Sequence, residues 1–321
     1  MIRVGVEASI NPQLLPSFSK DVELVRIPED PQGSIDIDLW IPPLEGPIAK
    51  KQWPHLKGVK VVQSLYAGVD AFLKWLPPGI TLCDARGVHD IPVAEWAVTA
   101  VLAMQKYIPF YVELQRKADW DSREKAEQIY LLSEGAKPGV GQPVLLDEIA
   151  DKTILIVGYG SIGQAIETRL AAFGANFLRI ARTAREGVEP IAKLDELLPK
   201  ADIVILITPI TSETRGLIDA NRLAKMKRGA LLVNAGRGEV VNTNALVAAL
   251  QEKRIRAAID VMDPEPLPPG HPLWHAPNLL ITPHIASDSA QFIKRAFQLA
   301  SEQADRLAKG EPLHNIVTGE Y

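Results

Sequence analysis

Cysteine and long apolar runs are scarce in this chain of 321 residues. The only cysteine, Cys83, excludes a disulfide within the chain and a zinc site built from several thiolates. The longest mostly apolar stretches, 97–104 and 203–207, fall far short of the roughly 18 residues that a membrane-spanning helix needs. The N-terminus lacks the basic and apolar regions of a signal peptide. We therefore expect a cytoplasmic protein with no membrane partner.

The chain also has no large excess of either charge sign. Its 35 Lys and Arg residues against 39 Asp and Glu residues give a formal net charge of -4. That balance offers no general attraction for phosphate backbones or anionic lipid, so no nucleic acid partner is expected. No pair of His, Asp or Glu residues has metal-ligand spacing within one element, so no metal site is expected.

Short apolar runs alternate with helical segments, a pattern that predicts an α/β fold. The length favours about two domains. Turns rich in proline separate the first predicted strands, which cover residues 3–6, 22–27, 35–40, 59–64 and 81–83. A helix is predicted from Pro92 to about Gln115, and Pro109 should kink or divide it. Residues 116–151 are polar and rich in glycine, which predicts a connecting loop.

A second series of strands and helices follows, and its strands are almost wholly Val, Ile and Leu. Its predicted strands are 153–157, 177–180, 203–207, 230–234, 257–261 and 279–282. Its predicted helices are 162–173, 193–198, 219–225 and 242–252, and a last helix covers about 287–309. Apolar strands that alternate with helices indicate a parallel sheet covered on both faces.

A glycine-rich turn lies between the strand 153–157 and the helix after it. Its six residues form a G-x-G-x-x-G motif, and we predict that they bind a dinucleotide: Gly158, Tyr159, Gly160, Ser161, Ile162 and Gly163. Its glycines allow a tight turn, close approach to a pyrophosphate, and close packing of helix on strand. The alternative is a tight turn that binds nothing.

The end of the next strand carries arginines in place of the usual acidic residue. An Asp or Glu about 20 residues after the motif normally accepts hydrogen bonds from the adenosine ribose. Ala181 stands there instead, and Arg182, Thr183 and Arg185 follow it. Guanidinium groups can bind a phosphate through two hydrogen bonds, so these residues favour NADP(H) over NAD(H). Alternatively, the two arginines are solvated loop charges.

Three candidate catalytic residues follow three of the later strands. Arg237 follows the strand 230–234, Glu265 follows 257–261, and His284 follows 279–282. Because carboxyl ends of parallel strands share one edge of the sheet, these side chains should gather there. Each also has a simpler explanation as an ordinary loop residue.

With these segments in place, the sequence resembles the D-isomer-specific 2-hydroxyacid dehydrogenases over nearly its whole length. The resemblance rests on the glycine turn, on residues 208–218, on the Arg237 segment, on 272–278 and on Thr282-Pro283-His284. It implies a Rossmann domain inserted into a flavodoxin-like substrate domain. The Rossmann domain would be residues 92–285, and the substrate domain residues 1–91 and 286–321.

The resemblance also implies roles for individual residues. Arg237 would bind the substrate carboxylate and polarise the keto group, His284 would exchange a proton with the C2 oxygen, and Glu265 would orient His284. An imidazole suits this task because it gains and loses a proton near neutral pH. Asp260 would contact the nicotinamide carboxamide.

Further binding residues follow from the same resemblance. The substrate contacts would include Tyr66, Ala67 and Gly68, although their segment could also be a plain strand-to-helix turn. The remaining cofactor contacts would be Thr208, Pro209, Thr214, Ala235 and Gly236. Of the other histidines, His89 is the one expected to reach the substrate site.

These features predict an enzyme that reduces a small 2-keto acid to a D-2-hydroxy acid, with glyoxylate and hydroxypyruvate as first candidates. NADP(H) is the preferred cofactor and NAD(H) the alternative. The resemblance implies a homodimer. Two other functions stay open: a dinucleotide-sensing protein similar to the related corepressors, and a formate or phosphite dehydrogenase on the same fold.

Overall fold

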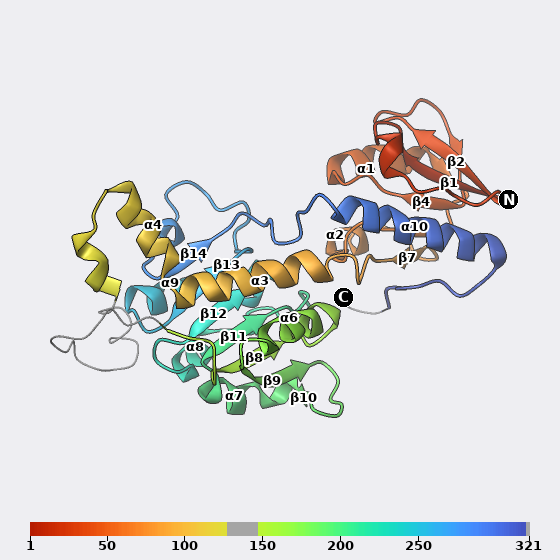
Figure 1. Cartoon of the computed structure of the whole chain (residues 1–321). Helices are drawn as coiled ribbons and strands as arrows, with labels where there is room; N and C mark the ends of the chain where they lie inside the picture. The colour runs from red at the N-terminus through yellow and green to blue at the C-terminus, as the bar shows by residue number, and fades with distance from the viewer. Residues whose placement is uncertain (127–146, 319–321) are drawn as a thin grey trace. The chain divides into compact units, whose positions relative to one another are not determined.

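A computed structural model describes residues 1–126 and 147–318. Contacts divide the chain into two compact units (Figure 1). The first combines Met1–Asp90 with Asp288–Tyr321, and the second is Ile91–Ser287. Each unit is built on a parallel sheet, which confirms the predicted α/β fold class. No helix in the described part of the chain is long and apolar enough to cross a membrane.

The first unit contains a five-stranded sheet in the order β2-β1-β4-β6-β7. Its strands are β1 (Ile2–Glu7), β2 (Val22–Ile27), β4 (Leu39–Ile41), β6 (Val61–Gln63) and β7 (Thr81–Cys83). Its helices are α1 (Gly46–Gln52), α2 (Asp70–Leu73) and α10 (Phe292–Lys309). One apolar core lies between the sheet and α10, and a second contains three neighbouring tryptophans, Trp40, Trp53 and Trp75. The last helix starts about five residues later than predicted.

The single strand predicted over 35–40 is wrong. Residues Ile35–Asp36 form β3, which pairs with β5 (Leu56–Lys57), whereas β4 joins the main sheet beside β1. Asp38 lies between the two strands, where its carboxylate accepts hydrogen bonds from the backbone N–H of Arg3 (3.0 Å) and from Lys60 Nζ (2.9 Å). The chain therefore changes sheets at Asp38, and local alternation cannot reveal such a change of partner.

The second unit contains a seven-stranded sheet in the order β10-β9-β8-β11-β12-β13-β14. Its strands are β8 (Thr153–Val157), β9 (Asn176–Ala181), β10 (Glu189–Pro190), β11 (Ile203–Leu206), β12 (Leu231–Asn234), β13 (Arg256–Ile259) and β14 (Leu279–Ile281). The order reverses at β8, since β9 lies on one side of it and β11 on the other. An open parallel sheet binds its ligand at such a point, outside the carboxyl ends of the strands.

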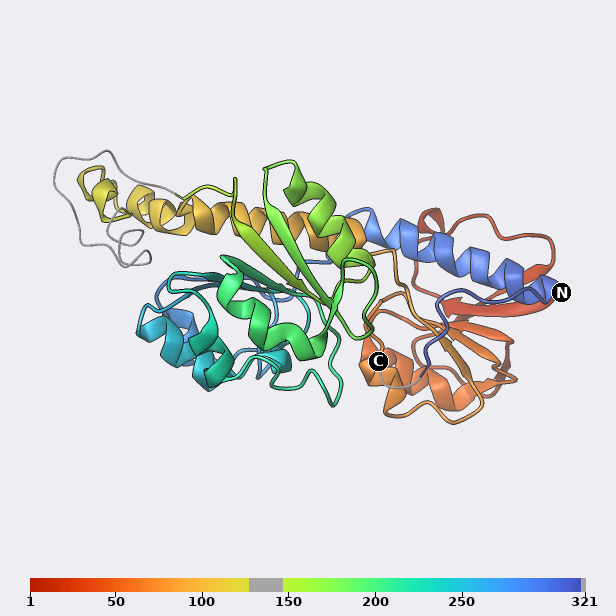
Figure 2. The ribbon, with the colours of Figure 1, turned by 90° about the horizontal axis from the view of Figure 1, so that it is seen from below.

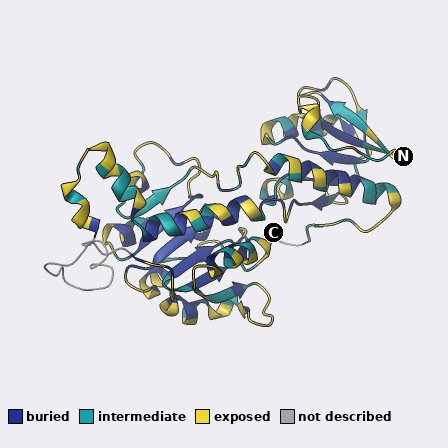
Figure 3. Cartoon of the chain, in the orientation of Figure 1, coloured by how far each residue is buried: buried dark blue, intermediate teal, exposed yellow. Residues whose placement is uncertain are grey.

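Helices cover both faces of this sheet. They are α3 (Asp90–Gln105), α6 (Ser161–Ala171), α7 (Leu194–Leu197), α8 (Ala220–Lys225) and α9 (Thr243–Gln251). A further helix, α4 (Ile108–Arg116), follows α3 and has no buried residue. Figure 2 shows α3 and α6 on one side of the sheet and α8 and α9 on the other. Leu155 of β8 packs against the second group and Ile154 against the first. The central strands are therefore buried on both faces (Figure 3), which explains their continuous apolar sequence.

The long helix predicted from Pro92 is divided as expected. The first helix ends at Gln105, Tyr107 has a left-handed backbone (φ 51°), and Pro109 lies in the first turn of α4. The loop predicted over 116–151 contains a short 3-10 helix, Asp121–Glu124, and otherwise lies largely outside the described residues.

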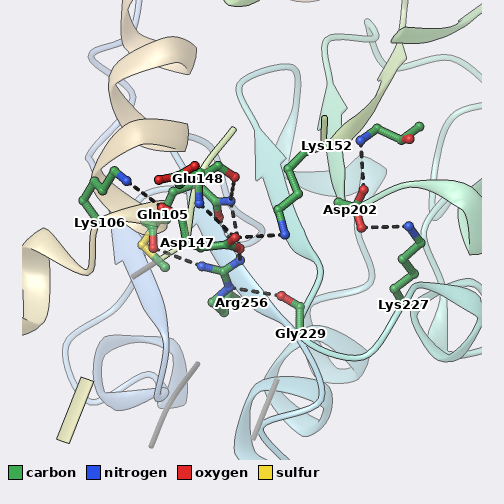
Figure 4. Close-up of polar contacts among 11 residues, drawn as sticks. Gln105, Lys106, Asp147, Glu148, Lys152, Asp202, Lys227, Gly229 and Arg256 are labelled. Carbon is green, nitrogen blue, oxygen red and sulfur yellow. Dashed lines mark hydrogen bonds and ion pairs between the residues drawn. The ribbon is translucent and has the colours of Figure 1, made fainter. Parts of the chain in front are cut away.

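Asp147, where the described chain resumes, belongs to a buried polar network (Figure 4). Its carboxylate lies 2.9 Å from Lys152 Nζ and 3.5 Å from Arg256 Nη2, and it accepts a hydrogen bond from Gln105 Nε2 (3.0 Å). Arg256 also donates to the carbonyl oxygens of Met104 and Gly229. This network ties the end of α3 to β13 and to the chain that enters β8. Removing one member would be costly, because it would leave a buried charge without its partner.

Candidate active site

The glycine turn joins β8 to α6 at the point where the strand order reverses. Two of its glycines are required by packing: a Cβ on Gly158 would lie 2.4 Å from the carbonyl oxygen of Ile207, and one on Gly163 would lie 3.0 Å from that of Gly158. Gly160 differs, because a Cβ there would meet nothing within 4 Å. The first helical hydrogen bond is donated by the N–H of Gln164. The N–H groups of Ile162 and Gly163 precede that bond in the first turn of α6 and point out of the helix end, a geometry suited to a pyrophosphate.

The carboxyl end of β11 contributes an orphaned buried hydroxyl beside this turn. Thr208 Oγ1 has no hydrogen-bond partner within the described residues, although Thr208 is only 7% exposed. A Cβ on Gly236 would lie 2.7 Å from the carbonyl oxygen of Thr208, so the ends of β11 and β12 approach closely. A bound dinucleotide at this edge would offer the hydroxyl a polar partner, and the residues present therefore fit the cofactor.

Thr214 uses its hydroxyl within the loop that follows β11. The hydroxyl donates to the carbonyl oxygen of Pro209 (2.7 Å) and accepts from the backbone N–H of Thr211 (2.8 Å). These bonds hold the loop in shape. The contact of Pro209 and Thr214 with a cofactor stays a prediction.

The end of β9 carries no carboxylate. Ala181 is its last residue, and Arg182, Thr183 and Arg185 are exposed in the loop that follows. The guanidinium of Arg185 donates a hydrogen bond to the carbonyl oxygen of Tyr159 in the glycine turn. This contact brings a positive charge from the loop after β9 to the glycine turn.

Arg237 lies in a loop organised by Asn234, which sequence reasoning missed. Asn234 is 1% exposed; its Oδ1 accepts from the N–H of Gly236 (3.1 Å) and its Nδ2 donates to the carbonyl oxygen of Arg237 (3.0 Å). A Cβ on Gly238 would lie 2.1 Å from the backbone of Met262, so this loop packs directly on the segment after β13. The signal was an asparagine at a strand end before Ala235 and Gly236, where its side chain commonly shapes a turn.

His284 and Glu265 are brought into direct contact, although 19 residues separate them. His284 Nδ1 lies 2.5 Å from Glu265 Oε1, and the two side chains are 45% and 38% exposed. His284 has a left-handed backbone (φ 54°), which is uncommon for a residue other than glycine and is found at functional sites. A carboxylate on Nδ1 fixes the orientation of the ring and leaves Nε2 as the nitrogen for proton exchange.

Asp260 holds the segment that carries His284. This carboxylate is 1% exposed and accepts three hydrogen bonds: from Thr282 Oγ1 (2.6 Å) and from the N–H groups of Ile285 (2.9 Å) and Ala286 (2.8 Å). Thr282 Oγ1 in turn accepts from Trp96 Nε1 (2.9 Å) in α3. The structure therefore gives Asp260 a positioning role beyond the nicotinamide contact predicted for it.

The predicted substrate loop belongs to the first unit and follows β6. The N–H of Tyr66 donates to Ser64 Oγ (3.0 Å), and the Tyr66 ring stacks on His89 (5.9 Å between centroids) and on Phe292 (5.6 Å). Burial raises the pKa of Tyr66 and lowers that of His89. Ala67 and Gly68 follow, and their contact with substrate stays a prediction. The described residues include no group of three or more His, Cys, Asp or Glu arranged to hold a metal ion.

Changing Asp260 to Asn should loosen the His284 segment. An amide replaces one acceptor oxygen by a donor, so one N–H of Ile285 or Ala286 loses its partner. We expect amide hydrogen exchange over 282–286 to become about ten-fold faster, the factor that a lost hydrogen bond of about 1.4 kcal/mol gives. Asp263→Asn, an exposed neighbour, is the control. Equal exchange rates in the two variants would contradict the positioning role.

Comparison with known proteins identifies relatives of this chain. The family described as "D-isomer specific 2-hydroxyacid dehydrogenase, NAD binding domain" matches residues 98–286. A glyoxylate reductase of Thermofilum pendens is 38% identical over 240 residues, which are 73% of this chain and 66% of that protein. A chloroplastic/mitochondrial formate dehydrogenase of Arabidopsis thaliana is 29% identical over 74% of this chain and 60% of its own length.

Solved structures match both units. An NADPH-dependent glyoxylate/hydroxypyruvate reductase of Sinorhizobium meliloti, solved with NADP and sulfate, is 27% identical with a TM-score of 0.78, and the match covers 99% of this chain and 98% of that one. A D-isomer specific 2-hydroxyacid dehydrogenase of Xanthobacter autotrophicus, solved with NADPH, is 29% identical with a TM-score of 0.74, and covers 98% of each chain. The glycine turn, the strand-end loops and these matches agree: the chain belongs to the D-isomer specific 2-hydroxyacid dehydrogenases, a family of NAD(P)-dependent oxidoreductases.

Proposed function

We propose that this protein reduces small 2-keto acids to D-2-hydroxy acids, with glyoxylate and hydroxypyruvate as first substrates and NADPH as preferred donor. The observation that carries the proposal is the contact between His284 Nδ1 and Glu265 Oε1 at the sheet edge that also carries the Arg237 loop. An imidazole held by a carboxylate, together with a guanidinium, matches a substrate that has a carbonyl to protonate and a carboxylate to bind.

In the proposed reaction, Arg237, His284 and Glu265 each have a separate role. A reduced nicotinamide, when bound, supplies the hydride that goes to C2 of the keto acid. Arg237 binds the substrate carboxylate and polarises the carbonyl, and His284 gives a proton from Nε2 to the oxygen that becomes the hydroxyl. Glu265 keeps the ring oriented through its contact with Nδ1. The turn around Gly160 and the hydroxyl of Thr208 would hold the dinucleotide.

Two relatives support the substrate class, since a glyoxylate reductase and a glyoxylate/hydroxypyruvate reductase are among the matches. A formate dehydrogenase is among them as well, which keeps that chemistry as the second candidate. A dinucleotide-sensing protein on the same fold is the third. Turnover separates the three candidates. A keto acid reductase oxidises NADPH only with a keto acid, a formate dehydrogenase turns over with formate instead, and a sensor binds the dinucleotide without turnover.

His284→Gln should lower the turnover number by about 100-fold or more, the usual contribution of a general acid, while the Kd for NADPH stays near that of the parent protein. Absorbance at 340 nm with glyoxylate, hydroxypyruvate, pyruvate and longer 2-keto acids measures turnover and ranks the substrates. His275→Gln, an exposed histidine of the same unit, is the control. Turnover near the parent value in His284→Gln would rule out the proton-donor assignment.

Replacing Arg182 and Arg185 together by Ala should weaken NADPH selectively. Loss of charge-assisted bonds to the 2′-phosphate should lower the NADPH-to-NADH ratio of kcat/KM by about ten-fold or more, since each such bond contributes about 1.5–3 kcal/mol. Lys200→Ala removes an exposed positive charge elsewhere in the unit and is the control. An unchanged ratio in the double variant would refute the phosphate recognition.

The family resemblance also leads us to propose a homodimer. Two apolar side chains near α4 support an interface there, since Ile108 is 48% exposed and Trp120 is 79% exposed. Light scattering during size-exclusion chromatography should give about 70 kDa, twice the 35.1 kDa of one chain. Trp120→Glu should shift the mass toward one chain, because a charge in an apolar interface is costly. A parent mass of one chain would refute the dimer.

A further inference from the structure

The Tyr159 ring contacts two guanidinium groups at the end of the predicted cofactor site. The guanidinium carbons of Arg179 and Arg185 each lie 5.6 Å from its centroid. Tyr159 is part of the glycine turn, Arg179 is in β9, and Arg185 is in the loop after β9. Both distances are within the range of cation–π interaction.

Arg179 is committed to an ion pair. Its Nε donates to Glu167 Oε2 (2.6 Å), its Nη2 donates to the other carboxylate oxygen, and both side chains are partly buried. The hydrogen bond from Arg179 lowers the pKa of Glu167. Because Glu167 neutralises its charge, Arg179 mainly supports the Tyr159 ring by packing against it.

Hydrogen bonds hold both the backbone and the side chain of Arg185. Its N–H donates to the carbonyl oxygen of Val188 (3.1 Å), and the N–H of Val188 donates back (2.9 Å), around Gly187 with φ 68°. Its guanidinium lies over the Tyr159 ring and donates one hydrogen bond to the Tyr159 carbonyl oxygen. Since a guanidinium has five N–H donors, further donors remain for an anion.

We infer that Tyr159 is a positioning residue for cofactor choice: its ring holds the Arg185 guanidinium where the 2′-phosphate of NADPH would lie. The inference rests on the proposed NADPH preference. Holding the side chain in advance lowers the entropy lost when phosphate binds, and stacking leaves the edges of the guanidinium open to oxygen atoms. Glu167 and Arg179 keep the ring in place.

The test is calorimetric binding of adenosine 2′,5′-bisphosphate and of 5′-AMP, which lack the nicotinamide. Tyr159→Leu removes the ring, and Tyr159→Phe keeps it. We expect Tyr159→Leu to weaken the bisphosphate about five-fold, the factor that about 1 kcal/mol of cation–π energy gives, and to leave 5′-AMP unchanged. Tyr159→Phe should weaken the bisphosphate less than Tyr159→Leu does, because it keeps the ring over Arg185.

A double-mutant cycle with Arg185→Ala decides whether the ring acts through Arg185. Tyr159→Leu should add little to the loss already caused by Arg185→Ala. Equal weakening of both probes, or additive losses in the double variant, would overturn the positioning role while the NADPH preference stands. If Arg185→Ala itself leaves bisphosphate affinity unchanged, the phosphate recognition fails, and the role of Tyr159 fails with it.

Discussion

The parallel pairing of β8, β11, β12, β13 and β14 is the constraint on which the candidate site depends. It places the carboxyl ends of all five strands along one edge, so that loops far apart in the chain become neighbours. Close approach of those ends then needs glycine at several positions, because a Cβ on Gly158, Gly236 or Gly238 would collide with the backbone of an adjacent loop. The same glycines that look like ligand-binding signals are therefore also required by packing.

Burial of polar groups gives the site its shape. Asp260 and Asn234 are almost fully buried, and each is paired with hydrogen-bonding groups of the loop that it supports. A buried polar group without partners is costly, so the loops that satisfy these two residues are held to one conformation. Those loops carry His284 and Arg237. The positions of these two proposed catalytic residues thus depend on supporting residues in the same loops.

Membership of the D-isomer specific 2-hydroxyacid dehydrogenases leaves cofactor choice and substrate to finer features of the chain. The end of β9 carries no carboxylate, and the loop after it carries Arg185, which the glycine turn helps to hold. Positive charge there and the aromatic ring of Tyr159 belong to one cluster with Glu167 and Arg179. We therefore propose that cofactor choice is set at the end of β9, apart from the strand ends that carry Arg237 and His284.

The sequence by itself determined the strands of the second unit except the short β10, the glycine turn, and the residue types that follow each strand. These depend on local periodicity and side-chain chemistry, so β8 was predicted with its observed bounds, Thr153–Val157. Only the tertiary structure decided that residues 35–40 change sheets, through which atoms Glu265 meets His284, and that Asp260 holds the segment after Thr282. The physical reason is that these contacts join segments distant in the chain, where strand order and burial, rather than local pattern, select the partner.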